Sequence, residues 1–87
     1  MSPLIVWDEP KRFFNIEKHG LDFAELTDDF IADALIEPSY GGRLMAIGKL
    51  NDKLVILVVF RPLGREALSV ISIRAANTRE RKRYETK

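Results

Sequence analysis

The 87-residue chain contains no cysteine, and this absence limits both its covalent stabilisation and its chemistry. Disulfides and thiolate metal sites are excluded, and a reducing, bacterial-type cytoplasm is the simplest location. Only one histidine is present, and no compact group of carboxylates on a recognisable loop accompanies it. We therefore do not expect a site with two metal ions, and we predict no metal and no cofactor.

Long apolar runs and targeting segments are also missing. The longest apolar run, residues 54–60, is too short to span a bilayer. The first ten residues lack the basic and apolar regions of a secretory signal. We expect no membrane association and a single domain over residues 1–87, because a chain of this length builds one core.

The net charge of +1 conceals an uneven distribution of charge along the chain. Residues 1–37 carry three basic and nine acidic residues, whereas residues 38–73 carry five and two, and residues 74–87 carry six and two. Such segregation indicates an acidic face and a basic face. The alternative is that both are ordinary solvated surface.

Apolar periodicity and turn residues predict an α+β fold. The expected strands cover residues 4–7, 31–37, 43–50, 53–60 and 67–74, and the expected helices cover residues 9–18, a stretch from Asp22 through Phe30, and residues 77–85. Asn51 and Asp52 suit a two-residue hairpin turn, and residues 61–66 read as a loop. Phe13 and Phe14 are assigned to the apolar side of the first helix. We expect an antiparallel meander of three to four strands, with two N-terminal helices and a basic C-terminal helix over one face.

The segment 67–85 joins an apolar strand to a strongly basic helix. Asn77 and Glu80 have the spacing of a capping box, which predicts that the helix begins there. A basic helix at the margin of a sheet suits a polyanion, and RNA is the first to consider.

Two separated segments also carry a family resemblance. The first comprises Trp7-Asp8-Glu9-Pro10-Lys11, Asn15, Lys18-His19-Gly20 and Phe23, and the second comprises Ile71-Ser72-Ile73-Arg74-Ala75-Ala76, Arg79-Glu80-Arg81 and Tyr84-Glu85. Arg43 and Ala46-Ile47-Gly48 lie between them in the same order. With these motifs the chain resembles the BrnT toxins of type II toxin–antitoxin systems over nearly its whole length.

This resemblance implies a RelE-like fold and a ribonuclease that arrests translation. It also implies a BrnA-type antitoxin with a ribbon-helix-helix domain, so that operator DNA is reached only through the antitoxin. A homodimer or a toxin–antitoxin hetero-oligomer is left open. Members of the family often carry a basic residue where this chain has Ala75, and another where it has Thr78.

Cleavage of RNA needs few protein groups, because the 2′-hydroxyl is a built-in nucleophile and no metal is required. The protein must move protons and stabilise charge on the phosphorane. Arg74 is the preferred contact for the scissile phosphate, since a guanidinium donates in a planar fork. The candidate catalytic residues are Arg74, His19, Lys11 and Tyr84, and the candidate RNA-binding residues are Arg61, Arg79, Arg83 and Lys82.

Each candidate has a structural alternative. Histidine titrates near neutral pH and suits a general acid or base, but His19 before Gly20 also suits a helix end. Lys11 is either a phosphate ligand or a surface lysine, and Tyr84 either contacts RNA or packs against the core. For the whole chain, the alternatives to a nuclease are a non-catalytic RNA-binding domain and a protein-interaction domain.

Overall fold

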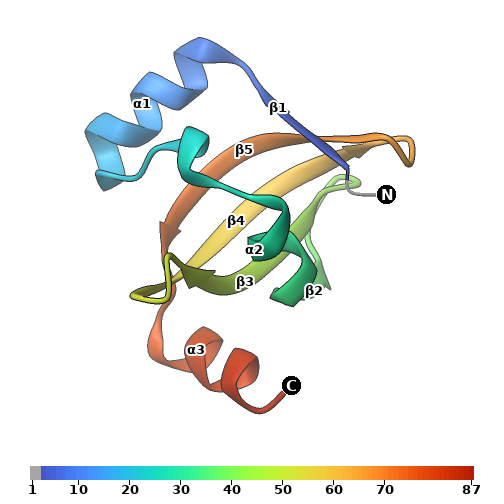
Figure 1. The fold of residues 1–87 in the computed structure, drawn as a ribbon. Coiled ribbons are helices and arrows are strands. Elements are labelled where there is room, and N and C mark those ends of the chain that lie inside the picture. Colours follow the sequence, from blue (N-terminus) through green and yellow to red (C-terminus); the bar gives the residue numbers. More distant parts are fainter. Residues whose placement is uncertain (1–2) are drawn as a thin grey trace.

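A five-stranded mixed sheet forms the body of the molecule. Figure 1 shows the computed structural model, which describes residues 3–87. The strands are β1 (Leu4–Trp7), β2 (Leu35–Pro38), β3 (Leu44–Leu50), β4 (Leu54–Leu63) and β5 (Ala67–Ala75). Their order across the sheet is β1-β5-β4-β3-β2, and β1 runs parallel to β5 while the other neighbours are antiparallel. The predicted α+β class is confirmed.

The predicted antiparallel meander is present as the four strands β2 to β5, but the sheet contains a fifth strand that the prediction left out of it. The strand at residues 4–7 was expected, but its partner was not, because the apolar pattern of a strand does not show where it pairs. It joins the far edge of the sheet beside the last strand, which makes five strands and a mixed sheet.

The helices differ from the prediction in the second segment. They are α1 (Glu9–His19), the short 3₁₀ helix η1 (Phe23–Glu25), α2 (Asp28–Asp33) and α3 (Thr78–Glu85). A single helix from Asp22 through Phe30 is wrong, because the backbone is extended at Leu26 and Thr27. The Thr27 hydroxyl accepts a hydrogen bond of 3.2 Å from the Phe30 N–H and starts a new helix. The expected edge strand over residues 31–37 is correspondingly shorter, as β2.

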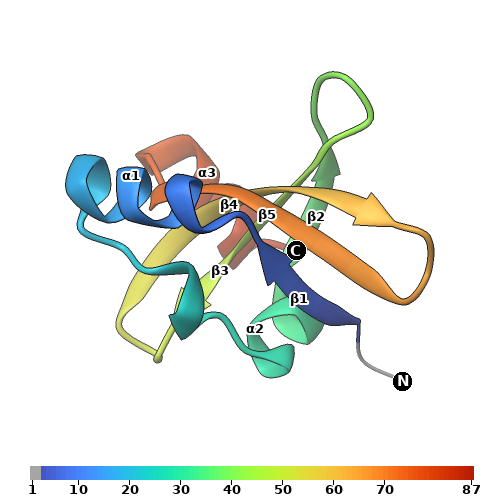
Figure 2. The same ribbon diagram turned by 90° about the horizontal axis from the view of Figure 1, so that it is seen from above.

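The inner face of the sheet carries the main core. It is the face against which η1 and α2 pack (Figure 2). Its buried members include Phe23, Leu26, Phe30, Ala46, Ile56, Val58, Val70 and Ile73. Gly48 belongs to this face, since a Cβ there would lie 3.0 Å from the Phe30 ring. The glycine therefore allows α2 to approach β3 closely.

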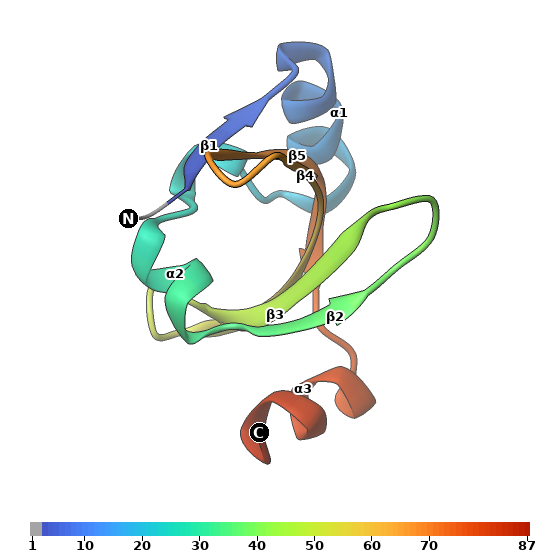
Figure 3. The ribbon, with the colours of Figure 1, turned by 90° about the vertical axis from the view of Figure 1, so that its right-hand side faces the viewer.

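The opposite side is the outer face, and α3 covers one part of it (Figure 3). Ile47, Leu57, Ala76 and Tyr84 form a second buried cluster there. The expectation that all helices lie over one face is therefore wrong. The physical reason is that β4 is apolar on both faces and requires cover on both, which this chain supplies from its own helices.

The strand β4 also runs further than predicted. Arg61–Leu63 continue the pairing with β5, so the expected loop over residues 61–66 is confined to residues 64–66. Pro62 is tolerated because β3 pairs no further than Phe60, which leaves β4 with a free edge beyond that point. A register shift opposite Val59 and Phe60 gives β5 one extra residue, Ile71. The Asn51-Asp52 turn is confirmed, with both residues at positive φ.

Candidate nucleic-acid interface

The helix α1 is fixed along the edge of β5 by a buried asparagine. β1 pairs with β5 only as far as Val70. Beyond that point the Asn15 side chain accepts a hydrogen bond of 2.9 Å from the Ile73 N–H and donates one of 2.9 Å to the Leu21 carbonyl. Asn15 is only 3% exposed, so α1 and the chain that follows it are held in one position on the sheet.

The end of α1 places His19 in the last turn. Gly20 adopts the left-handed conformation (φ 70°) and donates a hydrogen bond of 2.7 Å to the Ile16 carbonyl. This is the glycine termination that the sequence predicts. His19 is exposed and, within residues 3–87, its imidazole makes no side-chain hydrogen bond.

The cations of α1 divide into one that is paired and two that are not. Arg12 donates to Asp22 at 2.7 and 3.0 Å and to Glu9 at 3.0 Å. The Arg12 guanidinium lowers the pKa of the Asp22 carboxyl to about 2. Lys11 and Lys18 form no ion pair with any other residue in the described part of the chain. Their charges are therefore available to an external anion.

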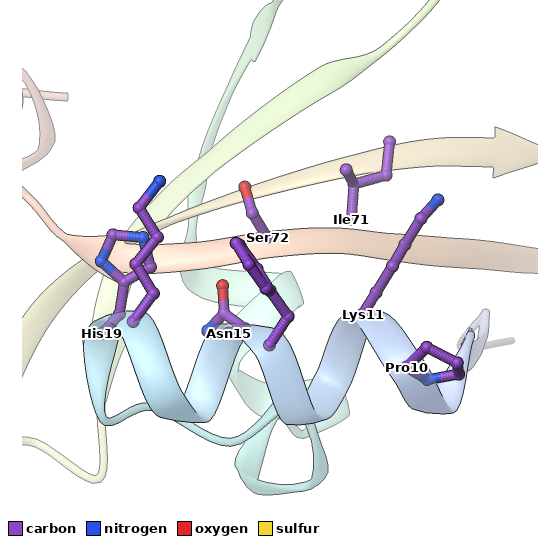
Figure 4. Close-up of a pocket in the computed structure, with 8 residues that line it drawn as sticks. Pro10, Lys11, Asn15, His19, Ile71 and Ser72 are labelled. Carbon is purple, nitrogen blue, oxygen red and sulfur yellow. The ribbon is translucent and has the colours of Figure 1, made fainter.

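Between α1 and β5 lies a cavity of about 410 Å³, the α1–β5 pocket. It is lined by Pro10, Lys11, Phe14, Asn15, Lys18, His19, Ile71 and Ser72. Lys11 and His19 rise from α1 toward the same side of β5 as Ser72 (Figure 4). The pocket thus combines two ammonium groups that form no ion pair within the described residues, an imidazole, a hydroxyl and an aromatic ring. These groups can bind a phosphodiester and transfer a proton.

The structure brings Lys11 and His19 together but holds Arg74 in a different contact. The Arg74 guanidinium forms a two-point ion pair with Glu80, with Nη1–Oε1 and Nη2–Oε2 distances of 2.8 and 2.9 Å. The Arg74 side chain is 41% exposed and that of Glu80 is 10% exposed. The ion pair lowers the pKa of Glu80. Because Glu80 also completes the confirmed capping box with Asn77, Arg74 helps to fix the start of α3.

Tyr84 lies away from the pocket, on the buried side of α3. Its hydroxyl donates a hydrogen bond of 2.6 Å to Asp33, and the residue is only 8% exposed. This hydrogen bond to a carboxylate raises the pKa of Tyr84. Arg83, the preceding residue on the same helix, pairs with Glu37 at 3.2 Å. Both residues tie α3 to the rest of the molecule.

The remaining candidates are exposed cations on or beside the outer face. Arg61 projects from the far part of β4, opposite Ser69, whereas Ser72 lies opposite Val59 and Arg74 opposite Leu57. The order along the outer face is therefore Arg61, the α1–β5 pocket, Arg74 and then α3. Arg79 and Lys82 are exposed on α3, the helix that follows β5 beyond Arg74.

Several residues of the pocket were not predicted from the sequence. Phe14 was assigned to the apolar side of α1, yet it is 64% exposed. Lys11, Phe14 and Lys18 follow one another at three and four residues, which places them on one face of a helix. That spacing was the available signal. For Asn15 and Ser72 no comparable signal exists, because their positions depend on tertiary contacts.

Acidic residues gather elsewhere on the described surface. Glu25, Asp29, Asp33 and Asp52 line a second cavity of about 320 Å³ near α2 and the β3–β4 turn. No group of three or more His, Cys, Asp or Glu side chains in residues 3–87 is arranged to hold a metal ion. In the same residues, no helix has the length and apolar content needed to cross a bilayer.

A small α+β domain with a row of cations beside an aromatic ring has the character of a nucleic-acid-binding protein. Residues 7–80 match the family described as ribonuclease toxin, BrnT, of type II toxin–antitoxin systems. The 1.1 Å crystal structure of the Brucella abortus ribonuclease toxin BrnT is 53% identical, with a TM-score of 0.83, and the match covers 88% of this chain and 100% of that one. A search of curated proteins found no match. This chain belongs to the BrnT family of ribonuclease toxins, which confirms the resemblance.

Proposed function

We propose that this chain is an endoribonuclease toxin and that the α1–β5 pocket receives the phosphodiester that is cleaved. The main support for the proposal is that Lys11, Lys18 and the sole histidine, His19, line one cavity. All three are exposed, and neither lysine pairs with an acidic residue of the described chain.

The reaction proceeds by attack of the RNA 2′-oxygen on the adjacent phosphorus. The bond from phosphorus to the 5′-oxygen breaks, leaving a 2′,3′-cyclic phosphate and a new 5′-hydroxyl. The 2′-hydroxyl loses a proton and the leaving 5′-oxygen gains one; His19 carries out one of these two transfers and solvent water the other. Lys11 and Lys18 stabilise the charge that develops on the phosphorane. No metal ion takes part in this scheme, because the substrate supplies the nucleophile and the lysines supply the positive charge.

The row of cations on the outer face gives the RNA backbone its path. Arg61 lies on one side of the pocket, and Arg79 and Lys82 lie on the other side, on α3. Arg74 positions α3 through Glu80 rather than contacting the scissile phosphate. Tyr84 likewise acts through packing, because its hydroxyl is committed to Asp33.

Family membership supports a wider assignment. We propose a RelE-like fold, inhibition of translation and a cytoplasmic location. A BrnA-type antitoxin with a ribbon-helix-helix domain neutralises the toxin and carries it to operator DNA. Each face of β4 contributes to a buried cluster within one chain, so this strand does not require a second copy of the chain. We therefore propose that the antitoxin determines how many toxin chains the complex contains.

The test is cleavage of a labelled RNA by the purified chain in the presence of EDTA. The expected products carry 5′-hydroxyl and cyclic phosphate ends. We expect His19→Gln and Lys11→Ala each to lower the rate by about 100-fold or more. Lys53→Ala, on the exposed β3–β4 turn, is the matched control and is expected to retain the wild-type rate.

A second candidate function is RNA binding without cleavage. It is favoured by the engagement of Arg74 with Glu80 and of Tyr84 with Asp33, since two predicted catalytic groups are thereby occupied. RNA that is bound in a salt-dependent manner but shows no new ends, with or without added divalent metal, would establish this alternative. Cleavage that requires a divalent ion would reject the metal-free scheme alone.

A further inference from the structure

Two adjacent phenylalanines on α1 have different surroundings. Phe13 is 60% exposed and Phe14 is 64% exposed, so neither contributes a buried ring to the core. The Arg12 guanidinium lies 5.3 Å from the centre of the Phe13 ring, and Arg12 is itself bound to Asp22 and Glu9. Phe14 instead lines the α1–β5 pocket. Phe14 is therefore an exposed aromatic ring at the border of a cationic cavity.

We propose that Phe14 is a stacking platform for a base of bound RNA, and that the α1–β5 pocket is a nucleotide subsite. The inference rests on the proposed function only in naming RNA as the ligand. It concerns binding and does not require that this chain cleaves what it binds. Aromatic side chains combined with a positively charged groove are the usual means of holding an unpaired strand.

The placement of the charges around the ring fits a nucleotide. Lys11 precedes Phe14 by three residues and Lys18 follows it by four, so the two ammonium groups flank the ring along one face of α1. Their Cα atoms are separated by about 10 Å along the helix axis, from the rise of 1.5 Å per residue. A base stacked on Phe14 therefore has a cation on each side for the phosphates of its own backbone.

In the absence of RNA, the Phe14 ring contacts a side chain of its own helix. The Lys18 Nζ lies 5.9 Å from the centre of the Phe14 ring, in an exposed cation–π contact. A base stacked on an aromatic ring is held more strongly than an exposed ammonium over the same ring. Incoming RNA therefore displaces the Lys18 ammonium from the ring and leaves it free to pair with a phosphate.

An apolar protein segment fits this pocket less well than a nucleotide. Covering Phe14 with such a segment would also remove Lys11, Lys18 and His19 from water without giving them partners. Burying unpaired charges is costly. A nucleotide covers the ring with its base and pairs the same cations with its phosphates, so one ligand satisfies both kinds of group.

The experiment measures binding of a short 2′-O-methyl RNA, which cannot be cleaved by 2′-oxygen attack. The RNA carries 2-aminopurine, whose fluorescence is quenched by stacking. We expect Phe14→Leu to weaken binding by about 5- to 100-fold and to abolish the quenching. Phe14→Trp, which keeps an aromatic surface, restores both, and the matched control Phe13→Leu stays within about twofold of wild type.

Salt dependence supplies a further readout. Phe14→Leu removes no charge, so the slope of log affinity against log salt stays at its wild-type value, whereas Lys11→Ala makes this negative slope shallower by about 0.7. The proposal is overturned if Phe14→Leu binds as tightly as wild type, or if Phe13→Leu loses as much. Phe14-dependent binding in a protein that does not cleave RNA rejects the nuclease and keeps the subsite. RNA binding that does not depend on Phe14, in a protein that cleaves RNA, rejects the subsite and keeps the nuclease.

Discussion

Asn15 on α1 accepts a hydrogen bond from the backbone N–H of Ile73, which lies 58 residues later in the chain. The same side chain donates to the Leu21 carbonyl, so one amide completes both the open edge of β5 and the loop after α1. Every residue that α1 contributes to the pocket depends on this attachment. Asn15 is therefore a structural residue at the base of the site.

Replacing Asn15 tests this role directly. Asn15→Ala leaves the Ile73 N–H and the Leu21 carbonyl without their partner in a buried setting, and each such group costs about 1 to 3 kcal/mol. We expect the free energy of unfolding in urea to fall by about 3 kcal/mol, while Lys11→Ala, on the exposed side of α1, changes it by less than about 0.5 kcal/mol. A fall below about 0.5 kcal/mol in Asn15→Ala would contradict the attachment.

The ion pair between Arg74 and Glu80 makes a second prediction. If Arg74 acts by positioning α3, then Arg74→Ala and Glu80→Ala both remove this contact, and Glu80→Ala also removes the acceptor for the Asn77 N–H. We expect both variants to lose stability and to lower RNA cleavage by similar factors, within about threefold of each other. A rate for Arg74→Ala at least about 100-fold below that of Glu80→Ala, in folded protein, would show that the guanidinium contacts the scissile phosphate.

The hydroxyl of Tyr84 gives a third test. Tyr84→Phe removes the hydrogen bond to Asp33 and leaves the buried ring in place. We expect a loss of about 1 kcal/mol in the free energy of unfolding, with the rate of RNA cleavage unchanged. The raised pKa of Tyr84 also makes its hydroxyl a poor acid. A large loss of rate at equal stability would instead identify Tyr84 as a proton donor.

The pH dependence of stability should reveal the Arg12–Asp22 pair. The pKa of Asp22 falls from an ordinary value of 3.8 to about 2 in the folded protein. Its contribution to stability is thus complete above pH 4 and is lost as the pH falls toward 2. The substitution Asp22→Asn keeps an acceptor for the Ala24 N–H but removes the charge. We expect the Tm of this variant to lie about 3 to 5 °C below wild type at pH 6.

The comparison between the two proteins isolates this pair. Asp33 and Glu80 also have lowered pKa values, but they remain in both proteins and contribute equally to both curves. Glu9 shares Arg12 with Asp22 and therefore belongs to the network that the substitution changes. The difference in Tm should therefore shrink between pH 4 and pH 2. A difference that stays constant over this range would show that the charge of Asp22 is not responsible.

Local signals predicted the features of this fold that depend on a few neighbouring residues. Gly20 ends α1, Asn51-Asp52 forms the β3–β4 turn, and Asn77 with Glu80 caps α3, each as the sequence indicates. In these cases backbone conformation or a hydrogen bond spans three or four residues. The family motifs in the sequence predicted the class of protein, a BrnT ribonuclease toxin.

Features that depend on contacts between residues far apart in the sequence could not be predicted from local patterns. The exposure of Phe14 and the burial of Asn15 reverse what their residue types suggest, because α1 rests on β5 through its asparagine rather than its phenylalanines. Arg74 was correctly placed at the end of a strand, but its ion pair with Glu80 depends on how α3 turns back onto the sheet. The split between η1 and α2 depends on Thr27, whose capping role competes with helix continuation.

The parallel pairing of β1 with β5 sets the order in which the molecule is completed. Leu4 lies beside Ala67, so β1 finds its neighbour only after β5 has been synthesised. Contacts between such distant positions slow folding, because a long loop must close before they form. The walls of the pocket, residues 10–19 and 71–72, are separated in the same way. A nascent chain therefore lacks the α1–β5 pocket until β5 has been synthesised.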